Sequence, residues 1–294
     1  MPPMEAVGLG LLAGLLFGLL TVLVRRGIMR VPDPVVGSVV VIGMALAVVL
    51  AATVVTGQAG DLADGRVAIA YLLIGLVAPG LSQIVFMLAV RDAGASRVAI
   101  MIGTAPLLAT VIAVGFRGEP LKAGLVAGTA LIVVGGASLA WERTLPPGFR
   151  TRGLVLGFAC ALLFAMRDNA MRIAGLETDM DARAATAWTL LGALIAVAGF
   201  AAVTRRGALP GQLRGLWRAY LPAGLVFGLA YTTLTIALSV GKVTVFAPLN
   251  AMQSMWTVLF AWILIGRAGD AIGVRVIGAM ALVVAGGILI GIFR

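Results

Sequence analysis

Long apolar runs separated by short polar or basic segments recur along the whole of this 294-residue chain. A run of about 18 residues is enough for a helix, which rises about 1.5 Å per residue, to cross a hydrocarbon layer of about 30 Å. Because the runs are continuous rather than alternating, they favour membrane helices over the strands of a membrane barrel. Ten spans are predicted, at residues 7–24, 35–55, 67–90, 98–116, 123–141, 153–173, 184–203, 216–240, 243–265 and 273–293.

The chain reads as one unit duplicated. The letters YLLIGLV at 71–77 return as YLPAGLV at 220–226, and Arg25 falls on Arg172 when LLFG at 15–18 is aligned with LLFA at 162–165. Internal repetition in a membrane protein is typical of secondary transporters. Five spans in each half, 1–145 and 150–294, force the second copy to cross the bilayer in the opposite sense. We therefore expect an all-α integral membrane fold of two inverted five-helix repeats.

Composition and charge agree with a membrane protein. Hydrophobic residues make up 61% of the chain and charged residues 12%, with a mean hydropathy of +1.11, whereas an average soluble domain has about 45–50% and about 25%. The net charge of +10 comes from basic residues scattered near span ends, which is a topology signal and not a nucleic-acid surface. Their excess after odd-numbered spans favours both termini outside. The expected partner is the lipid bilayer of the inner (plasma) membrane, and no nucleic acid.

Two residue types that carry much of enzyme chemistry are almost missing. Cys160 is the one cysteine and there is no histidine, which excludes an internal disulfide, a cysteine or histidine metal site and a Ser-His-Asp triad. We expect no metal, no cofactor and no enzyme activity. A membrane-embedded enzyme acting on lipid stays as the alternative.

Glycines recur at every fourth position in several spans, as at Gly10, Gly14 and Gly18 and again at Gly224 and Gly228. Small residues at this spacing let two helix backbones approach closely in a membrane. Packing within the chain is the preferred interpretation over an oligomer face. We expect a monomer, with a homodimer as the alternative.

Short motifs repeat between the halves and resemble a known family. They are Phe17, Gly18 and Arg25 with Phe164, Ala165 and Arg172, and Pro106 with Gly118 and Glu119. In this respect the chain resembles the drug/metabolite transporter superfamily, specifically its EamA-type members, and is similar to YddG-like amino-acid and metabolite exporters. The second half departs from the pattern, with Ser254 in place of the motif proline and Arg267 in place of the acidic residue. Pro106 and Pro248 lie inside predicted spans, where each is expected to kink its helix.

The resemblance implies a secondary active or facilitative transporter that works by alternating access through a cavity between the two repeats. Its expected solute is a small polar or amphipathic metabolite, foremost an amino acid or a related compound, moved outward. The alternative is an importer or exchanger of a vitamin, a nucleotide or a phosphorylated metabolite.

The cluster Arg167, Asp168 and Asn169 in the sixth span is the outstanding polar feature, because ionisable groups at membrane depth are expensive. Asp168 and Arg172 are four residues apart and are expected to pair on one helix face. Such pairing would keep Asp168 charged. The mode of energy coupling therefore stays open between proton coupling, exchange and uniport. Arg167 then has no local counter-ion and suits the carboxylate or phosphate of a solute. The alternative is a helix that ends early, with Arg167 reaching the interface.

Other polar or aromatic side chains in the spans are candidates for the same cavity. Ser82 and Gln83 correspond to positions 231 and 232 in the second half, Tyr231 shares a helix face with Thr235, and Asn250 shares one with Gln253. The predicted solute-binding residues are Arg167, Asp168, Ser82, Gln83, Tyr231, Thr235, Trp188, Asn250 and Gln253. The alternative for the neutral ones is hydrogen bonding between helices.

Overall fold

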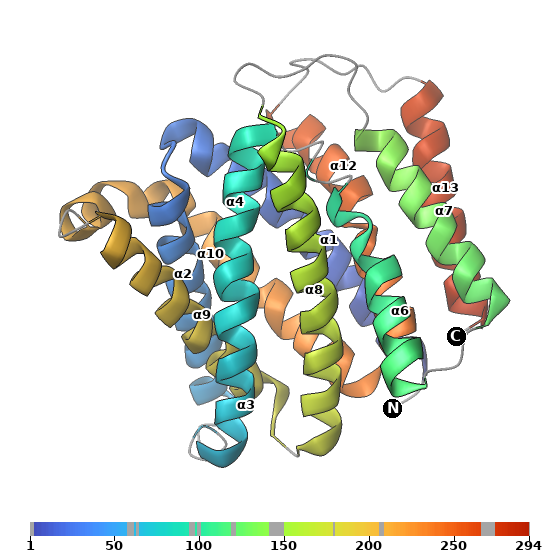
Figure 1. Ribbon diagram of the computed structural model, residues 1–294, viewed down its shortest axis with the longest axis horizontal. Helices are drawn as coiled ribbons and strands as arrows, with labels where there is room; N and C mark the ends of the chain where they lie inside the picture. Colours follow the sequence, from blue (N-terminus) through green and yellow to red (C-terminus); the bar gives the residue numbers. More distant parts are fainter. Residues whose placement is uncertain are drawn as a thin grey trace.

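A computed structural model describes residues 3–57, 62, 65–93, 98, 101–118, 122–140, 150–178, 180–205, 209–265 and 274–293, and all regular structure within these ranges is helical (Figure 1). The helices of the first half are α1 (Pro3–Arg30), α2 (Pro34–Val55), α3 (Gly65–Gly75), the π-helical segment η2 (Leu76–Leu81), α4 (Ser82–Ala93), α6 (Ala105–Arg117) and α7 (Ala123–Ala140). Those of the second half are α8 (Arg152–Glu177), α9 (Ala182–Arg205), α10 (Leu209–Val240), α11 (Val243–Ala251), α12 (Gln253–Ile265) and α13 (Val274–Phe293).

Six helices in the described part of the chain are long and apolar enough to cross a membrane, and they are Glu5–Arg30, Pro34–Val55, Val67–Ala93, Arg152–Glu177, Ala182–Thr204 and Trp217–Val240. Three shorter apolar helices accompany them, Ala105–Phe116, Ala123–Ser138 and Gly278–Ile290. Each of the six overlaps one of the ten predicted spans. The count of ten stays a prediction.

Three predicted spans are interrupted where the sequence suggested continuous helices. Ala78 has extended backbone angles inside η2, between α3 and α4. The chain turns at Gly103 and Thr104 just before α6. Met252 separates α11 from α12. Pro106 lies in the first turn of α6, where a missing N–H is harmless, and so marks a helix start and not a kink.

The two halves of the chain interlock. The α3 helix packs on α9 and the corresponding α10 packs on α2, while α4 packs on α8 and α10 also packs on α1. The last helices of the halves, α7 and α13, lie side by side at one edge of the molecule (Figure 1). Each half therefore packs against the other along several helices.

The glycines predicted to bring helices together do so within the chain. A Cβ atom added at Gly14 of α1 would lie 3.1 Å from the carbonyl oxygen of Leu249 and 3.2 Å from that of Asn250. One added at Gly18 would lie 2.9 Å from the carbonyl oxygen of Gln253. The glycine face of α1 thus packs against the break between α11 and α12.

The tyrosines of the duplicated motif tie each half to the other. Tyr220 of α10 donates its hydroxyl to the carbonyl oxygen of Val31, just past the end of α1, at 2.7 Å. Tyr71 of α3 shares a 3.1 Å hydrogen bond with the hydroxyl of Thr178, just past the end of α8. Each hydroxyl therefore meets the carboxyl end of the first helix of the opposite half, where helix carbonyl groups lack partners of their own.

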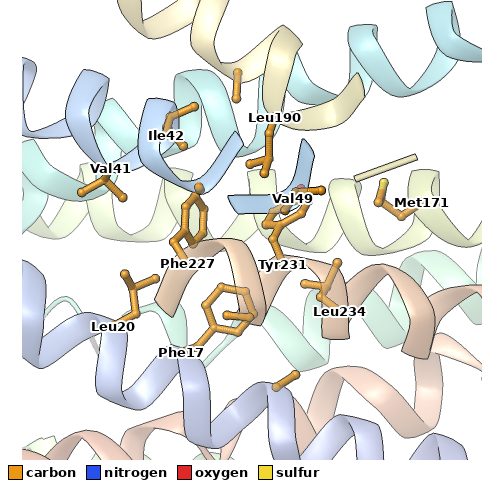
Figure 2. Packing of buried hydrophobic residues seen from close by; sticks show 14 of the residues in the cluster. Phe17, Leu20, Val41, Ile42, Val49, Met171, Leu190, Phe227, Tyr231 and Leu234 are labelled. Carbon is orange, nitrogen blue, oxygen red and sulfur yellow. The ribbon is translucent and has the colours of Figure 1, made fainter. Parts of the chain in front are cut away.

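Buried apolar side chains form the main core beside this interface. Phe17 of α1, Phe227 and Tyr231 of α10 stack edge to face, with ring centroids 6.2 Å apart for the first pair and 5.6 Å for the second (Figure 2). Val41 and Leu190 belong to the same cluster and come from α2 and α9. Edge-to-face pairs add about 0.5–1.5 kcal/mol to the gain from burial. Part of this core forms one wall of a cavity between the two halves.

Candidate functional site

A chamber of about 740 Å³, a volume that includes its open mouth, lies between the two halves. Its lining residues are Phe17, Leu20, Thr21, Pro79, Gln83, Phe86, Ile102, Phe164, Arg167, Phe227, Asn250, Gln253, Ser254 and Thr257. They come from α1, η2, α4, α8, α10, α11 and α12, with Ile102 from the helical residues just before the turn that leads into α6.

A smaller hollow of about 270 Å³ adjoins the chamber. The two share Ile102, Phe164, Arg167, Asn250 and Gln253. The hollow adds Asp168 and the first residues of α6 to the lining. Arg167 therefore faces both spaces, and Asp168 faces the smaller one.

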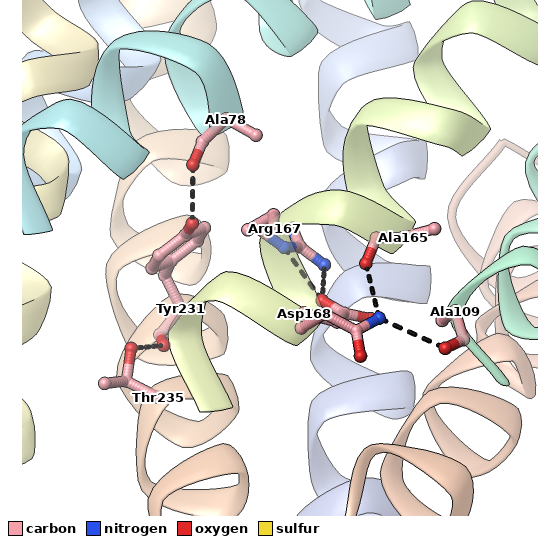
Figure 3. Close-up of polar contacts among 8 residues, drawn as sticks. Ala78, Ala109, Ala165, Arg167, Asp168, Tyr231 and Thr235 are labelled. Atoms are coloured by element: carbon pink, nitrogen blue, oxygen red, sulfur yellow. Dashed lines mark hydrogen bonds and ion pairs between the residues drawn. The ribbon is translucent and has the colours of Figure 1, made fainter. Parts of the chain in front are cut away.

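Arg167 and Asp168 form a buried ion pair (Figure 3). The guanidinium donates from Nη2 at 2.7 Å and from Nε at 2.9 Å, and both bonds go to the same oxygen, Oδ1 of Asp168. The two side chains are 5% and 6% exposed. The α8 helix continues to Glu177. The alternative in which α8 ends early and Arg167 reaches the interface is therefore wrong.

The predicted pairing of Asp168 with Arg172 is also wrong, as is the expectation that Arg167 lacks a local counter-ion. Arg172 instead donates from Nη1 to the carbonyl oxygens of Leu238 and Ser239 in the last turn of α10, at 3.1 and 2.8 Å. Carbonyl groups at a helix end have no intrahelical partner and attract cations. Arg167, buried at the chamber wall, takes the adjacent carboxylate because an unpaired buried charge is strongly unfavourable.

Aromatic rings complete the surroundings of the guanidinium. Its Cζ lies 4.9 Å from the ring centroid of Phe164 and 5.6 Å from that of Tyr231. Cations are attracted to ring faces within about 6 Å. The rings and Asp168 together hold Arg167 in one orientation at the wall of the chamber.

Three carboxamide side chains lie in the chamber wall without hydrogen-bond partners among the described residues. They belong to Gln83 of α4, Asn250 of α11 and Gln253 of α12. Nε2 of Gln83 and Oδ1 of Asn250 are fully enclosed. A buried polar group left unpaired costs about 1–3 kcal/mol. One unpaired donor, on Gln83, and one unpaired acceptor, on Asn250, are therefore enclosed at the chamber wall.

The break between α11 and α12 brings two of these carboxamides together. Asn250 is in the last turn of α11 and Gln253 is the first residue of α12. Ser254 bonds back to the carbonyl oxygen of Ala251 across the break at 3.2 Å. Irregular backbone at membrane depth occurs where it lines a cavity or is buried in protein. Here it lines the chamber.

Four of the nine predicted binding residues lie outside the lining of both spaces: Tyr231, Thr235, Ser82 and Trp188. Tyr231 donates its hydroxyl to the carbonyl oxygen of Ala78 in η2 at 3.1 Å (Figure 3). Thr235 accepts a 2.8 Å hydrogen bond from the hydroxyl of Thr186 in α9. These are bonds between helices, the alternative kept for the neutral residues. Within the described part of the chain, Oγ of Ser82 and Nε1 of Trp188 are buried and have no hydrogen-bond partner.

Asn169, the third member of the predicted polar cluster, lies outside the lining as well. Its Nδ2 bonds the carbonyl oxygens of Ala109 in α6 and Ala165 in α8, at 3.1 and 3.0 Å. It therefore ties α8 to α6 (Figure 3).

Most of the apolar lining was not among the predicted binding residues. Four phenylalanines, Phe17, Phe86, Phe164 and Phe227, form it together with Leu20 and Ile102. Phe17 and Phe164 occupy equivalent places in the duplicated motif, which was the available signal. The other two lack that signal, because only the packing of α4 and α10 turns them toward the chamber.

Comparison with known proteins places these features in context. The sequence model of the EamA-like transporter family matches the chain twice, over residues 4–140 and 151–292, one match within each predicted half. The crystal structure of another protein superposes on this chain with a TM-score of 0.78. The match covers 98% of this chain and 96% of the other chain at 20% sequence identity, and it shows a likeness of fold alone. Comparison with curated proteins gave no significant match.

Proposed function

Because this chain belongs to the EamA-like transporter family, it is a membrane transporter of small molecules, and we propose that its solute binds in the chamber between the two halves. Its six long apolar helices make it a multi-pass membrane protein. We further propose ten spans in two inverted sets of five. The double family match supports this arrangement, and so do the shorter apolar helices α6, α7 and α13.

The observation that carries the proposal is the set of uncommitted polar groups in the chamber. Gln83, Asn250 and Gln253 contribute three carboxamides from both halves, surrounded by phenylalanine rings. Each carboxamide offers two donors and an acceptor. A small polar or amphipathic metabolite would meet both kinds of wall, and an amino acid or related compound moved outward across an inner membrane remains the leading candidate.

Alternating access is the mechanism that best suits these contacts. The chamber is walled by both halves, and backbone interruptions lie at its edge in η2 and between α11 and α12. Interrupted helices at the interface between repeats are where secondary transporters bind their solutes. A monomer suffices, because the chamber is formed within one chain.

Counterflow into proteoliposomes tests the proposal. Vesicles containing the purified protein are loaded with one unlabelled solute at a time, from a panel of amino acids and small organic ions, and uptake of the labelled solute is measured with and without a pH gradient. Gln253→Ala is compared with Ile263→Ala, because Ile263 is on the same helix and its side chain is 56% exposed, toward lipid in the proposed arrangement.

We expect Gln253→Ala to reduce counterflow by about tenfold, because a lost hydrogen bond in a buried site is worth about 1–2 kcal/mol. Ile263→Ala should match the unaltered protein. Absence of counterflow for the whole panel would refute the transport proposal for these solute classes. Chemical change in the vesicle lipid without any solute flux would favour the membrane-embedded enzyme instead.

A further inference from the structure

We propose that Asp168 sets the charge selectivity of the chamber: by neutralising Arg167 it restricts the site to solutes with no net charge. This inference rests on the proposed function, because it assigns a solute class to the same chamber. An anionic solute was expected because the Arg167 guanidinium was expected to be unpaired, and its ion pair with Asp168 removes that reason.

The charge count of the two spaces is the first support. Among the described residues that line the chamber and the adjoining hollow, Arg167 and Asp168 are the two that carry a charge. Both are at least nine-tenths buried and are joined by two hydrogen bonds. The described part of the lining therefore has no net formal charge, and its other polar groups are neutral.

The geometry of the pair is the second support. Both guanidinium bonds converge on Oδ1 of Asp168, and the faces of Phe164 and Tyr231 stand close to the cation. An anionic solute would have to share Arg167 with Asp168, which places two negative charges beside one positive charge in a poorly solvated site. Burial of an uncompensated charge is strongly unfavourable. A neutral or zwitterionic solute adds no net charge and can use the carboxamides.

Removal of the carboxylate should reverse this preference. Asp168→Asn keeps the size and shape of the side chain but leaves the Arg167 guanidinium without an anion. A solute carboxylate would then supply the missing charge, and a carboxylate can take two parallel hydrogen bonds from a guanidinium. The same substitution should leave binding of a neutral solute of the same shape much less affected.

Two probes of matched shape test the inference, 3-phenylpropanoate as the anion and 3-phenylpropanamide as its neutral counterpart. The phenyl ring suits the four phenylalanines of the lining. Binding of each probe to purified full-length protein in detergent is measured near neutral pH, where the acid is ionised. Because binding needs no transport step, the result does not depend on finding flux. The variants are Asp168→Asn, the charge-preserving Asp168→Glu, and the double variant Arg167→Gln with Asp168→Asn.

The unaltered protein should bind the amide more tightly than the carboxylate. In Asp168→Asn the affinity for the carboxylate should rise by about tenfold or more, as one added charge-assisted hydrogen bond would produce. Asp168→Glu should keep the original preference, and the double variant should lose the gain because no free guanidinium remains.

Three results would overturn the inference. They are an unaltered protein that fails to prefer the amide, an unchanged carboxylate affinity in Asp168→Asn, and a gain that survives in the double variant. The first of these needs no variant, so it decides the question even where a substitution prevents folding. A confirmed change of preference without counterflow in vesicles would contradict only the proposed transport.

Discussion

Replacement of Gly192 in α9 by alanine should separate two helices whose backbones touch. A Cβ atom added at Gly192 would contact the carbonyl oxygen of Leu72 in α3 and would lie 2.9 Å from its carbonyl carbon. The relation is mutual, since a Cβ at Gly75 of α3 would contact the carbonyl oxygen of Thr189 in α9 and lie 2.7 Å from its carbonyl carbon. The atoms in the way belong to helical backbones and have no rotamer into which to move.

The magnitude follows from the size of this overlap. The helices must move apart by about 1 Å before the new methyl group reaches ordinary van der Waals distance, and overpacking of a well-packed interior costs about 1–3 kcal/mol. Because rigid backbone blocks the methyl group, we expect about 2–3 kcal/mol. In soluble proteins 1 kcal/mol lowers the melting temperature by about 2–4 °C at 150–250 residues. Gly192→Ala should therefore melt about 5–10 °C below the unaltered protein.

Gly199→Ala is the matched control in the same helix. Gly199 is exposed, and a Cβ atom built there meets nothing within 4 Å. Alanine is favoured over glycine in a helix by about 1 kcal/mol, so this variant should melt at the same temperature or slightly higher. Thermal unfolding of the purified proteins in one detergent, followed by circular dichroism, provides the comparison. If Gly192→Ala and Gly199→Ala melted together, the close approach of α3 and α9 would be refuted.

Further predictions concern the contacts that tie the halves together. Tyr220→Phe removes the 2.7 Å bond to the carbonyl of Val31 and should lower stability by about 1 kcal/mol; an unchanged melting temperature would contradict this. Tyr71→Phe should have a smaller effect, because its bond is longer, at 3.1 Å, and the Thr178 hydroxyl keeps its own bond to the carbonyl oxygen of Ala174. Asp92→Asn should lower stability by about 1–3 kcal/mol, because the 3%-exposed carboxylate of Asp92 in α4 pairs at 2.5 Å with Arg152 of α8. A variant that melted within 1 °C of the unaltered protein would argue against this pair.

Much of the architecture was predictable because membrane segments follow local rules. In lipid the backbone must satisfy its own hydrogen bonds, so a long apolar run can be little other than a helix. All six long apolar helices overlap predicted spans, and the two family matches lie within the predicted halves. The interruption at Ala78 had a local signal in Pro79, because the residue before a proline is disfavoured in a helix; its distant partner Tyr231, 153 residues away, could not be read from the sequence.

The candidate site was predictable only in part. Gln83, Arg167, Asp168, Asn250 and Gln253 line the chamber or its adjoining hollow. A search for polar residues within apolar spans finds them, because burial of polar groups in a membrane requires a reason. The same search also finds Ser82, the immediate neighbour of Gln83, which lies outside both linings. Successive helix residues point about 100 degrees apart, so the packing of the helix decides which of two neighbours faces the chamber.

The sequence by itself determined the class of this protein, a duplicated bundle of membrane helices, since run length, composition and repetition are properties of the chain alone. Tertiary structure alone decided the partners of its charges. Two partners competed for Arg172: the carboxylate of Asp168, four residues away, and the carbonyl groups at the end of α10, more than sixty residues away. Those distant carbonyls accept its hydrogen bonds, and Asp168 is left to neutralise Arg167. Ion pairs and open helix ends compete in three dimensions, and spacing along the chain records only the local competitor.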